Sequence, residues 1–567
     1  MLNGGNHEVA YFSMEIALDP AIPTYSGGLG ILAGDTLRSA ADLGVSMAGV
    51  SLVHRKGHFR QQLDPAGNQT EGPSDWRPEE KLEPMKPVVT VMIEGRSVHV
   101  RAWRWVVKGV DGDVVPVYLL DTDLPENSEE DRRLTDVLYG GDQRHRLCQE
   151  AILGFGGVEL LPALGHSHIA SYHMNEGHAS LLTIALMEQR LGGVRTLRDV
   201  TVEDVRAVRH RCVFTTHTPV PAGHDQFPMS LVRQVLGEDR AVALERTKAA
   251  SGGILNMTYL ALFAARYING VAMHHGEVSR GLFPDYPVRA ITNGVHAATW
   301  VMPPIACVLD NHMPEWRRDN LYLRYAVGIP VREIQDAHAK AKATLLAEVR
   351  RRTGVELSDT AFTIGFARRA TGYKRADLVF SNLERLLQMD RQIGPIQLVF
   401  GGKAHPHDES GRTVIRRVFE AAKNLGGAVP VVYLEDFDWQ LSPLLYSGVD
   451  LWLNTPRRPH EASGTSGMKA ALNGVPSLSV LDGWWLEGCF EGVTGWAIGH
   501  AEIAETEQLE SASLYDKLEQ TILPMFYGRP TAYAEVMRSA IAVNGSFFNS
   551  QRMLSQYQAN AYFQRPD

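Results

Sequence analysis

Lys469 is the residue whose position first suggests chemistry, because it follows a run of small residues and precedes an apolar segment (EASGTSGMKAALNG, residues 461–474). If a helix begins within this run, its first backbone N–H groups and hydroxyls suit a phosphate, and they belong to Gly464, Thr465, Ser466 and Gly467. A cation at this end of a helix is unfavourable by roughly 0.3–1 kcal/mol. Low dielectric and nearby cations lower the pKa of a lysine, which favours the neutral amine and imine chemistry. The segment therefore predicts an anion site beside a reactive amine, and a lysine that extends toward solvent is the alternative.

A second group of cations follows a predicted strand at residues 360–367. Within eight residues of the stretch FARRATGYKRAD (366–377) lie Arg368, Arg369, Lys374 and Arg375. Guanidinium and ammonium groups at the carboxyl end of a buried strand suit a phosphate better than a neutral ligand. A solvated basic patch at a helix start is the alternative, and the position after a strand favours the phosphate.

The glycine-rich stretch YSGGLGILAGD (residues 25–35) is a third candidate for anion binding. Gly27, Gly28 and Gly30 allow a ligand to approach the backbone closely before a helix. Gly34 comes one residue too late for the dinucleotide fingerprint, so NAD is not expected. A tight turn without a ligand explains the same letters.

The second half of the chain contains the elements that would position these groups. Five apolar, β-rich runs read as buried strands, at 360–367, 395–402, 428–434, 449–454 and 475–481. Helical patterns separate them; after Arg375, one helix face is predicted from Val379, Leu383, Leu386 and Leu387. This alternation predicts a doubly wound parallel sheet with ligands at the carboxyl ends of its strands.

The first half is less regular but contains similar elements. Residues 88–103 alternate like two antiparallel strands, and residues 168–176 and 211–219 read as buried strands that end in polar loops. A Pro- and Trp-rich segment at 296–330 is the predicted connection between the halves. We therefore expect two α/β domains, 1–296 and 297–567, with the last helix (547–563) packed back on another part.

Composition and charge limit the partners. The chain has 567 residues, a net charge of −9 and no basic block, which argues against nucleic acid and anionic membranes. It has no apolar run of about 20 residues and no signal-peptide pattern at its start. Its four cysteines form no C-x-x-C pair, and the spacing of four nearby histidines fits no standard metal site: His166, His168, His173 and His178. A reduced, soluble, cytoplasmic protein without a metal is expected.

EASGTSGMKAALNG resembles the pyridoxal-phosphate lysine motif of the α-glucan (glycogen, starch, maltodextrin) phosphorylases. Further segments follow in that family's order along nearly the whole chain: YFSMEIALD, YSGGLGILAGD, MNEGHASL, TTHTPVPAGHDQF, TNGVHAATW, RRATGYKR, FGGKAHP and FFNSQRMLSQY. YSGGLGILAGD and LDGWW are most similar to the short bacterial and archaeal branch. The resemblance implies two Rossmann-like, doubly wound α/β domains that face a central cleft (the GT-B type).

The resemblance also implies a cofactor and a reaction. Lys469 would carry pyridoxal phosphate as an imine, and the phosphate of this cofactor would be bound by Gly464, Thr465, Ser466 and Lys374. Arg369, with Arg368 beside it, would bind the substrate phosphate. The implied reaction is reversible phosphorolysis of α-1,4-glucan or maltooligosaccharide at the non-reducing end, with retention, to give α-glucose 1-phosphate; the cofactor phosphate serves as a proton shuttle.

The remaining site residues are also implied only by the resemblance. Glu461 and Tyr373 would bind ring hydroxyls, and Asn293 would lie with His217 near the 6-hydroxyl. The backbone of Gly28 and Leu29 would contact sugar and phosphate, and Glu176 and His178 would line the same cleft. Without the family context, His178 and His217 fit core histidines equally well. A homodimer is compatible with the resemblance.

The chain departs from the family pattern at several positions. Gly467 replaces an asparagine, Glu176 an aspartate, and Phe437 and Asp438 a tyrosine and an arginine. Trp484 and Trp485 stand where small polar residues are usual, and stacking on sugar or core packing would explain them. Because the chain begins close to the catalytic core, we expect no phosphorylation or nucleotide control of the kind carried on a long N-terminal extension. The alternatives are a glycosyltransferase that needs no pyridoxal phosphate, similar to glycogen synthase, and a carbohydrate-binding pseudoenzyme.

Overall fold

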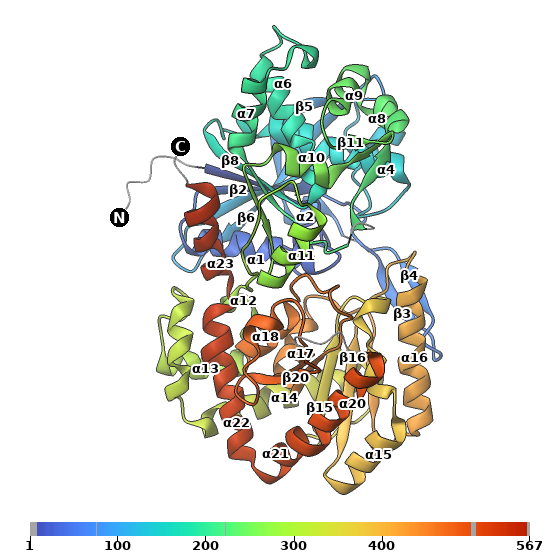
Figure 1. Ribbon diagram of the computed structural model, residues 1–567, viewed down its shortest axis with the longest axis vertical. Coiled ribbons are helices and arrows are strands. Elements are labelled where there is room, and N and C mark those ends of the chain that lie inside the picture. Colours follow the sequence, from blue (N-terminus) through green and yellow to red (C-terminus); the bar gives the residue numbers. More distant parts are fainter. Residues whose placement is uncertain (1–7, 75, 221–222, 501–505, 564–567) are drawn as a thin grey trace.

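The N-terminal half of the chain forms one nine-stranded sheet. The computed structural model describes residues 8–74, 76–220, 223–500 and 506–563 (Figure 1). In spatial order, the strands of this sheet are β14 (Val288–Ala290), β13 (Tyr267–Gly270), β9 (Cys212–Thr215), β8 (Ile169–Asn175), β1 (Glu8–Phe12), β2 (Met47–Leu52), β7 (Val114–Asp121), β6 (Arg96–Lys108) and β5 (Glu83–Ile93). The strands from β14 to β7 pair in parallel, whereas β5, β6 and β7 pair antiparallel. The antiparallel pair predicted at 88–103 and the strands predicted at 168–176 and 211–219 are thus confirmed.

The C-terminal half forms a second sheet of six strands that is entirely parallel. In spatial order, its strands are β17 (Val431–Leu434), β16 (Ile396–Gly401), β15 (Phe362–Ala367), β18 (Leu451–Asn454), β19 (Ser477–Val480) and β20 (Gly495–Ile498). Five of them confirm the predicted strands. The sixth, β20, was not predicted, because its four residues GWAI are flanked by short polar loops and give almost no periodic signal. The α/β class with parallel sheets is confirmed.

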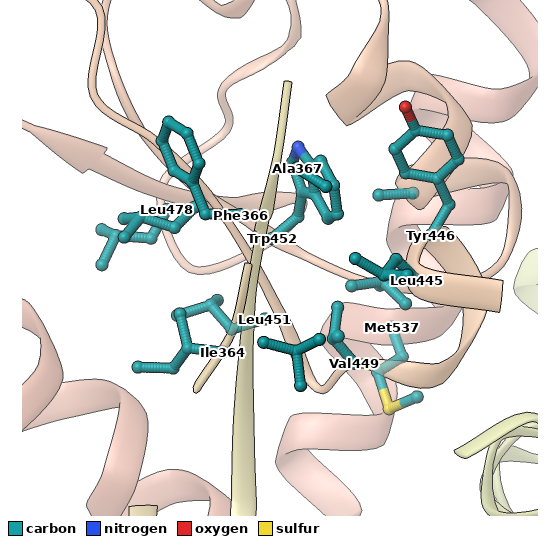
Figure 2. Close-up of a cluster of buried hydrophobic side chains, with 14 of the residues drawn as sticks. Ile364, Phe366, Ala367, Leu445, Tyr446, Val449, Leu451, Trp452, Leu478 and Met537 are labelled. Carbon is teal, nitrogen blue, oxygen red and sulfur yellow. The ribbon is translucent and has the colours of Figure 1, made fainter. Parts of the chain in front are cut away.

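Apolar side chains cover both faces of the six-stranded sheet (Figure 2). Ile364 of β15 and Leu478 of β19 lie on one side of the sheet, and Leu445 of α17 (Ser442–Gly448) and Met537 of α22 (Pro530–Ser539) lie on the other. Burial on both faces explains why the strands of this half read as continuous apolar runs and not as alternating ones.

The helix predicted after Arg375 differs from the structure at its start. Val379 lies in a short 3₁₀ turn (Leu378–Phe380), and the helix α15 begins only at Leu383 and ends at Gln392. The side chain of Asn382 accepts a hydrogen bond from the backbone N–H of Arg385 and so caps the helix there. The cap starts a new helix after the turn, which is why the single helix predicted from Val379 onward is wrong.

The segment predicted to connect the halves is helical. It comprises α12 (Ala297–Trp300), α13 (Pro303–His312) and a 3₁₀ helix (Asn320–Gly328), and it leads into α14 (Val331–Thr353). Trp300, Ile305 and Trp316 of this segment are fully buried in the same hydrophobic cluster as the six-stranded sheet.

Two segments cross between the halves (Figure 1). Helix α23 (Ser550–Tyr557), near the C-terminus, packs against α1 (Gly28–Asp42), and the Tyr557 hydroxyl hydrogen-bonds Thr215 at 3.0 Å. In the opposite direction, the hairpin of β3 (Arg60–Leu63) and β4 (Gln69–Gly72) leaves the N-terminal half and lies beside α16 (Glu409–Leu425). None of the helices in the described ranges is long and apolar enough to span a bilayer.

Candidate active site

Lys469 lies on α18 (Ser466–Leu472), immediately after the loop that follows β18, and is 4% exposed. Its Nζ lies 3.9 Å from the ring centroid of Trp300 and 5.5 Å from that of Tyr446, so two aromatic faces hold the ammonium. Burial lowers the pKa of Lys469 to about 8, although the negative charge of Asp35 opposes the shift. The structure therefore places an amine that loses its proton easily in an aromatic pocket.

Hydrogen bonds of Asn473 connect α18 with the segment that carries Trp300. The Asn473 side-chain amide donates to the backbone carbonyls of Trp300 and Lys469, at 2.8 and 2.9 Å, and its oxygen accepts from the N–H of Met302 at 2.8 Å. The Trp300 indole N–H donates to Asp35 of α1 at 2.8 Å, which fixes the plane of the ring. Helix α18, α12 and α1 together hold the ammonium in place.

The small residues before Lys469 form a loop that lies close to other site residues. Gly464 has a φ of +83°, and a Cβ there would lie 3.3 Å from the Glu461 carboxyl group and 3.5 Å from Arg368, so glycine is required. Thr465 is the N-cap of α18, and its side chain makes no capping hydrogen bond. The Ser466 hydroxyl accepts from the Trp452 indole at 3.2 Å. Both hydroxyls thus keep an O–H that a ligand could accept, since that of Ser466 only accepts in this contact.

Glu461, Arg368 and Lys374 form a buried ionic cluster. Glu461 accepts hydrogen bonds from the Lys374 ammonium and, at 2.7 Å, from the Arg368 guanidinium. Burial alone would raise the pKa of Glu461, but the two cations hold it at about 2. Burial and the charge of Arg368 lower the pKa of Lys374 to about 7. Two cations share one carboxylate here, so the cluster has an excess positive charge that favours binding of a further anion.

Tyr373 and Arg369 flank this cluster. The Tyr373 ring centroid lies 4.7 Å from the Lys374 ammonium, and burial, assisted by the Glu461 charge, raises the pKa of its hydroxyl, so that it stays protonated. Arg369 is exposed. Burial lowers the pKa of His58 to about 3, with further contributions from the charges of Lys403, His405 and Arg369. Arg369 is thus free to meet a ligand from solvent.

Tyr446 connects the ionic cluster with Lys469. Burial raises the pKa of its hydroxyl, and the positive charge of Arg368 opposes this rise, so Arg368 lies within electrostatic reach of the ring whose face the Lys469 ammonium contacts. The structure therefore brings together the cations predicted to bind the two phosphates.

Glu176 and His217 lie together at the carboxyl ends of β8 and β9 in the N-terminal sheet. The backbone N–H of His217 donates to the Glu176 carboxylate, and the ring Nε2 of His217 hydrogen-bonds Asn175 Oδ1 at 2.7 Å. Glu176 has a φ of +84°, a strained conformation for a residue with a side chain. Burial raises the pKa of Glu176 to about 7 and lowers that of His217 to about 3, so the imidazole is neutral.

His178 is a buried histidine. Its Nε2 accepts a hydrogen bond from the backbone N–H of Met14 at 2.8 Å, and burial lowers its pKa to about 3. Two of the other histidines considered for a metal are also satisfied, since His166 bonds Glu8 and Tyr118, and His173 bonds Tyr562 and Thr215. Within the described part of the chain, no group of three or more His, Cys, Asp or Glu residues is arranged to hold a metal ion.

Asn293 is buried in the loop after β14, and its Oδ1 has no hydrogen-bond partner among the residues that the structure describes. The Asn293 backbone carbonyl accepts from Arg552 of α23 at 2.9 Å, which fixes this loop. Such an orphaned, buried acceptor points to a donor from a ligand.

Gly28 and Leu29 begin α1, where Gly28 is exposed and a Cβ on it would meet nothing within 4 Å. The amides just before them are already used, because Ser26 and Gly27 donate to the Glu15 carboxylate at 2.6 and 3.2 Å. Glu15 thus occupies part of the anion site predicted from this stretch. No motif within residues 25–35 indicated it, because it lies ten residues before that segment.

The departures at Gly467 and Trp484 are linked. A Cβ on Gly467 would lie 2.8 Å from the Trp484 ring, so the asparagine usual in the family does not fit beside this tryptophan. Trp484 and Trp485 are 2% and 1% exposed, and the Trp484 ring packs on Phe548 at 4.8 Å between centroids. Both tryptophans are therefore part of the core.

Three residues of the aromatic pocket were not predicted: Trp300, Tyr446 and Asp35. The sequence holds one signal for them, the TNGVHAATW segment, which places Trp300 seven residues after Asn293. Tyr446 and Asp35 lie within apolar helical segments, where nothing in the local pattern distinguishes a pocket residue from a core residue.

Comparison with known proteins identifies the family. The sequence model of the family described as Carbohydrate phosphorylase matches residues 238–491. The chain is 38% identical to the maltodextrin phosphorylase of Thermococcus litoralis, over 97% of this chain and 70% of that protein. It is 36% identical to the glycogen phosphorylase of Mycobacterium tuberculosis (strain H37Rv), over 98% and 70%, and 33% identical to that of Aquifex aeolicus, over 97% and 85%. These archaeal and bacterial relatives confirm the resemblance, and the chain belongs to the carbohydrate phosphorylase family of glycosyltransferases.

Proposed function

We propose that this chain is an α-1,4-glucan phosphorylase, which removes glucose from the non-reducing end of the glucan as α-glucose 1-phosphate, reversibly and with retention. The observation that carries the proposal is the pair of sites near Tyr446, which are the buried amine of Lys469 and the cation-rich cluster around Glu461. The names of the relatives, which are maltodextrin and glycogen phosphorylases, support the same substrate class.

The residues around Lys469 fit pyridoxal phosphate. The amine is buried, has a pKa of about 8 and faces two aromatic rings, as a flat cofactor aldehyde requires. Lys469 would hold the cofactor covalently, and its phosphate would be bound by Lys374 and the loop residues Gly464, Thr465 and Ser466. When bound, pyridoxal phosphate supplies a second phosphate group that exchanges a proton with the substrate phosphate.

The cations of this chain would bring the two phosphates together. Arg369 and Arg368 would bind the substrate phosphate, and their fixed charges would offset the repulsion between the two anions. Lys374, with a pKa of about 7, would hold its proton firmly once an additional anion lies beside it. The protein thus gains affinity for phosphate from a cluster in which two cations are offset by only one carboxylate.

The N-terminal residues would hold the glucosyl unit that is transferred. Cleavage builds positive charge on the anomeric carbon, which the substrate phosphate stabilises. His217 is neutral, so its ring adds no cation near that carbon. The orphaned oxygen of Asn293 would accept a sugar hydroxyl, and Glu461, Tyr373 and Glu176 would bind further hydroxyls, with Gly28 and Leu29 offering backbone amides.

The architecture we propose is the GT-B type, with domains 1–296 and 297–567 facing a cleft. Its support is that the site residues follow parallel strands in both sheets: Glu176 follows β8, His217 follows β9, Arg368 follows β15 and Glu461 follows β18. Ligands bind at this end of parallel strands in open α/β sheets.

Release of glucose 1-phosphate from maltodextrin and inorganic phosphate, dependent on added pyridoxal phosphate, tests the proposal. No release of glucose 1-phosphate, with transfer of glucose from a nucleotide sugar instead, would favour a synthase-like glycosyltransferase. Binding of maltodextrin and cofactor with no release of glucose 1-phosphate would favour a carbohydrate-binding pseudoenzyme.

A further inference from the structure

The hairpin of β3 and β4 carries two buried glutamines, Gln61 and Gln69, whose exposed fractions are 2% and 3%. Their amides are bonded to each other, with Gln61 Nε2 donating to Gln69 Oε1 at 2.8 Å. The hairpin extends from the N-terminal half and lies against the C-terminal half (Figure 1), and both amides also donate hydrogen bonds to the C-terminal half. The glutamines therefore form a polar contact between the halves that water does not reach.

The two glutamines hold one loop, residues 401–404, which begins at the last residue of β16. Gln69 bonds Ala404 twice, donating to its carbonyl at 2.8 Å and accepting from its N–H at 2.9 Å. Gln61 donates to the Gly402 carbonyl at 2.9 Å and accepts from the N–H of Asp436 at 3.0 Å. The hairpin thus fixes the loop at the carbonyls of Gly402 and Ala404 by direct hydrogen bonds.

The same loop holds the backbone of the arginine pair. The N–H of Arg368 donates to the Gly401 carbonyl at 3.1 Å, and the N–H of Ala370 donates to the Lys403 carbonyl at 2.9 Å. Contact is closest at Gly402, where a Cβ would lie 1.8 Å from the Arg368 carbonyl oxygen. Arg369, which lies between these two bonded residues, therefore follows any movement of the loop.

We propose that Gln61 and Gln69 are positioning residues for phosphate binding. From the N-terminal half, they fix the 401–404 loop and, through it, the backbone that carries Arg368 and Arg369. This inference rests on the proposed role of Arg369 as a ligand of the substrate phosphate. It implies that the phosphate site is complete only while the hairpin is docked, so that contact between the halves and affinity for phosphate are coupled.

Methionine variants test the positioning role, since methionine is similar to glutamine in length and makes no comparable hydrogen bonds. In the protein loaded with pyridoxal phosphate, Gln61→Met and Gln69→Met should each weaken the binding of inorganic phosphate, measured by calorimetry, about tenfold. The KM for phosphate should rise by the same factor, whereas the KM for maltodextrin should stay within about twofold. Hydrogen exchange at residues 366–372 should become faster in both variants.

Glu435→Ala is the matched control. It removes a different bond between the hairpin and the C-terminal half, in which Leu63 N–H donates to the Glu435 carboxylate at 3.1 Å, and leaves the 401–404 loop untouched. It should change neither phosphate binding nor exchange at 366–372. Equal changes in both KM values, unchanged phosphate affinity in the methionine variants, or the same effects in Glu435→Ala would overturn the positioning role. Failure of the wild-type protein to release glucose 1-phosphate would instead refute the proposed function, and calorimetry and hydrogen exchange would still decide the inference.

Discussion

Two buried lysines of the C-terminal half, Lys342 and Lys469, are satisfied in opposite ways. Lys342 of α14 donates to the Asp450 carboxylate at 2.6 Å and to the Ala361 carbonyl at 2.7 Å, and the other oxygen of Asp450 bonds His338 at 2.9 Å. Lys469 faces the rings of Trp300 and Tyr446 instead. A buried ammonium is normally paired with oxygen atoms, so the aromatic surroundings of Lys469 mark it as a functional group, whereas the surroundings of Lys342 mark a structural one.

Replacing each lysine should separate these roles, and this is the largest effect we expect. Lys469→Ala should lower phosphorolysis by more than about 10³-fold, beyond the loss of a single hydrogen-bond donor, with little change in the stability of the apoprotein. Lys342→Met should leave Asp450 buried with its main partner gone and cost about 3–5 kcal/mol of unfolding free energy. Initial rates and denaturant titrations of both variants check this. A stable Lys342→Met protein, or an active Lys469→Ala protein, would contradict the comparison.

Glu461→Gln tests the ionic cluster, in which Lys374 is paired with a carboxylate, like Lys342, but has a proposed role in the site, like Lys469. The carboxylate offsets the charges of Arg368 and Lys374 and, as proposed, binds a sugar hydroxyl, so its loss should lower kcat/KM by about 10²–10³-fold. Phosphate should still bind, because both cations remain. Separate KM values for phosphate and maltodextrin provide the measurement, and a variant with wild-type kcat/KM would remove Glu461 from the site.

The pH dependence of cofactor uptake tests the lowered pKa of Lys469. Only the neutral amine reacts with an aldehyde, so the rate of pyridoxal phosphate uptake by the apoprotein should rise about tenfold per pH unit up to about pH 8 and then level off. The apoprotein should also gain stability from this group as the pH rises from about 8 to 10.5, because the unfolded lysine still binds a proton in that window. Nα-acetyl-lysine, which keeps a free side-chain amine, serves as the control, and its rate of reaction with pyridoxal phosphate should continue to rise toward pH 10.5. An uptake rate that shows no levelling near pH 8 would argue against the aromatic pocket.

The smallest effect is expected at Asn293, in comparison with Asn473. Both asparagines are buried, but Asn293 Oδ1 lacks a partner within the described ranges, whereas the Asn473 side chain makes three hydrogen bonds. Asn293→Ala should raise the KM for maltodextrin about tenfold with little loss of stability. Asn473→Ala should cost about 1–3 kcal/mol of stability. Thermal unfolding together with kinetics distinguishes the two, and a reversed pattern would show that Asn293 is structural.

The sequence allowed the parallel sheets to be predicted because burial on both faces produces continuous apolar runs, as in β15 and β16. It also indicated the cations at 368–375, because they directly follow a buried strand, and Lys469, because it stands at the start of a helix after a run of small residues. It did not reveal the contacts that depend on the packing of distant segments. Glu15 fills part of the glycine-rich turn, and Gln61 and Gln69 hold a loop more than 300 residues away in the chain.

Local chemistry also explains the details that pattern analysis missed. The cap at Asn382 makes α15 begin later in the chain than predicted, and the Trp484 ring leaves no space for a side chain at position 467. Neither effect has a periodic signature. Both depend on a single contact between particular atoms.

Borohydride reduction followed by peptide mass spectrometry tests the central claim most directly, because it asks which lysine carries the cofactor. After incubation of the protein with pyridoxal phosphate, we expect one stable pyridoxyl adduct, on the peptide that contains Lys469, and none on Lys342 or Lys374. A protein with no adduct, or with its main adduct on another lysine, would contradict the account.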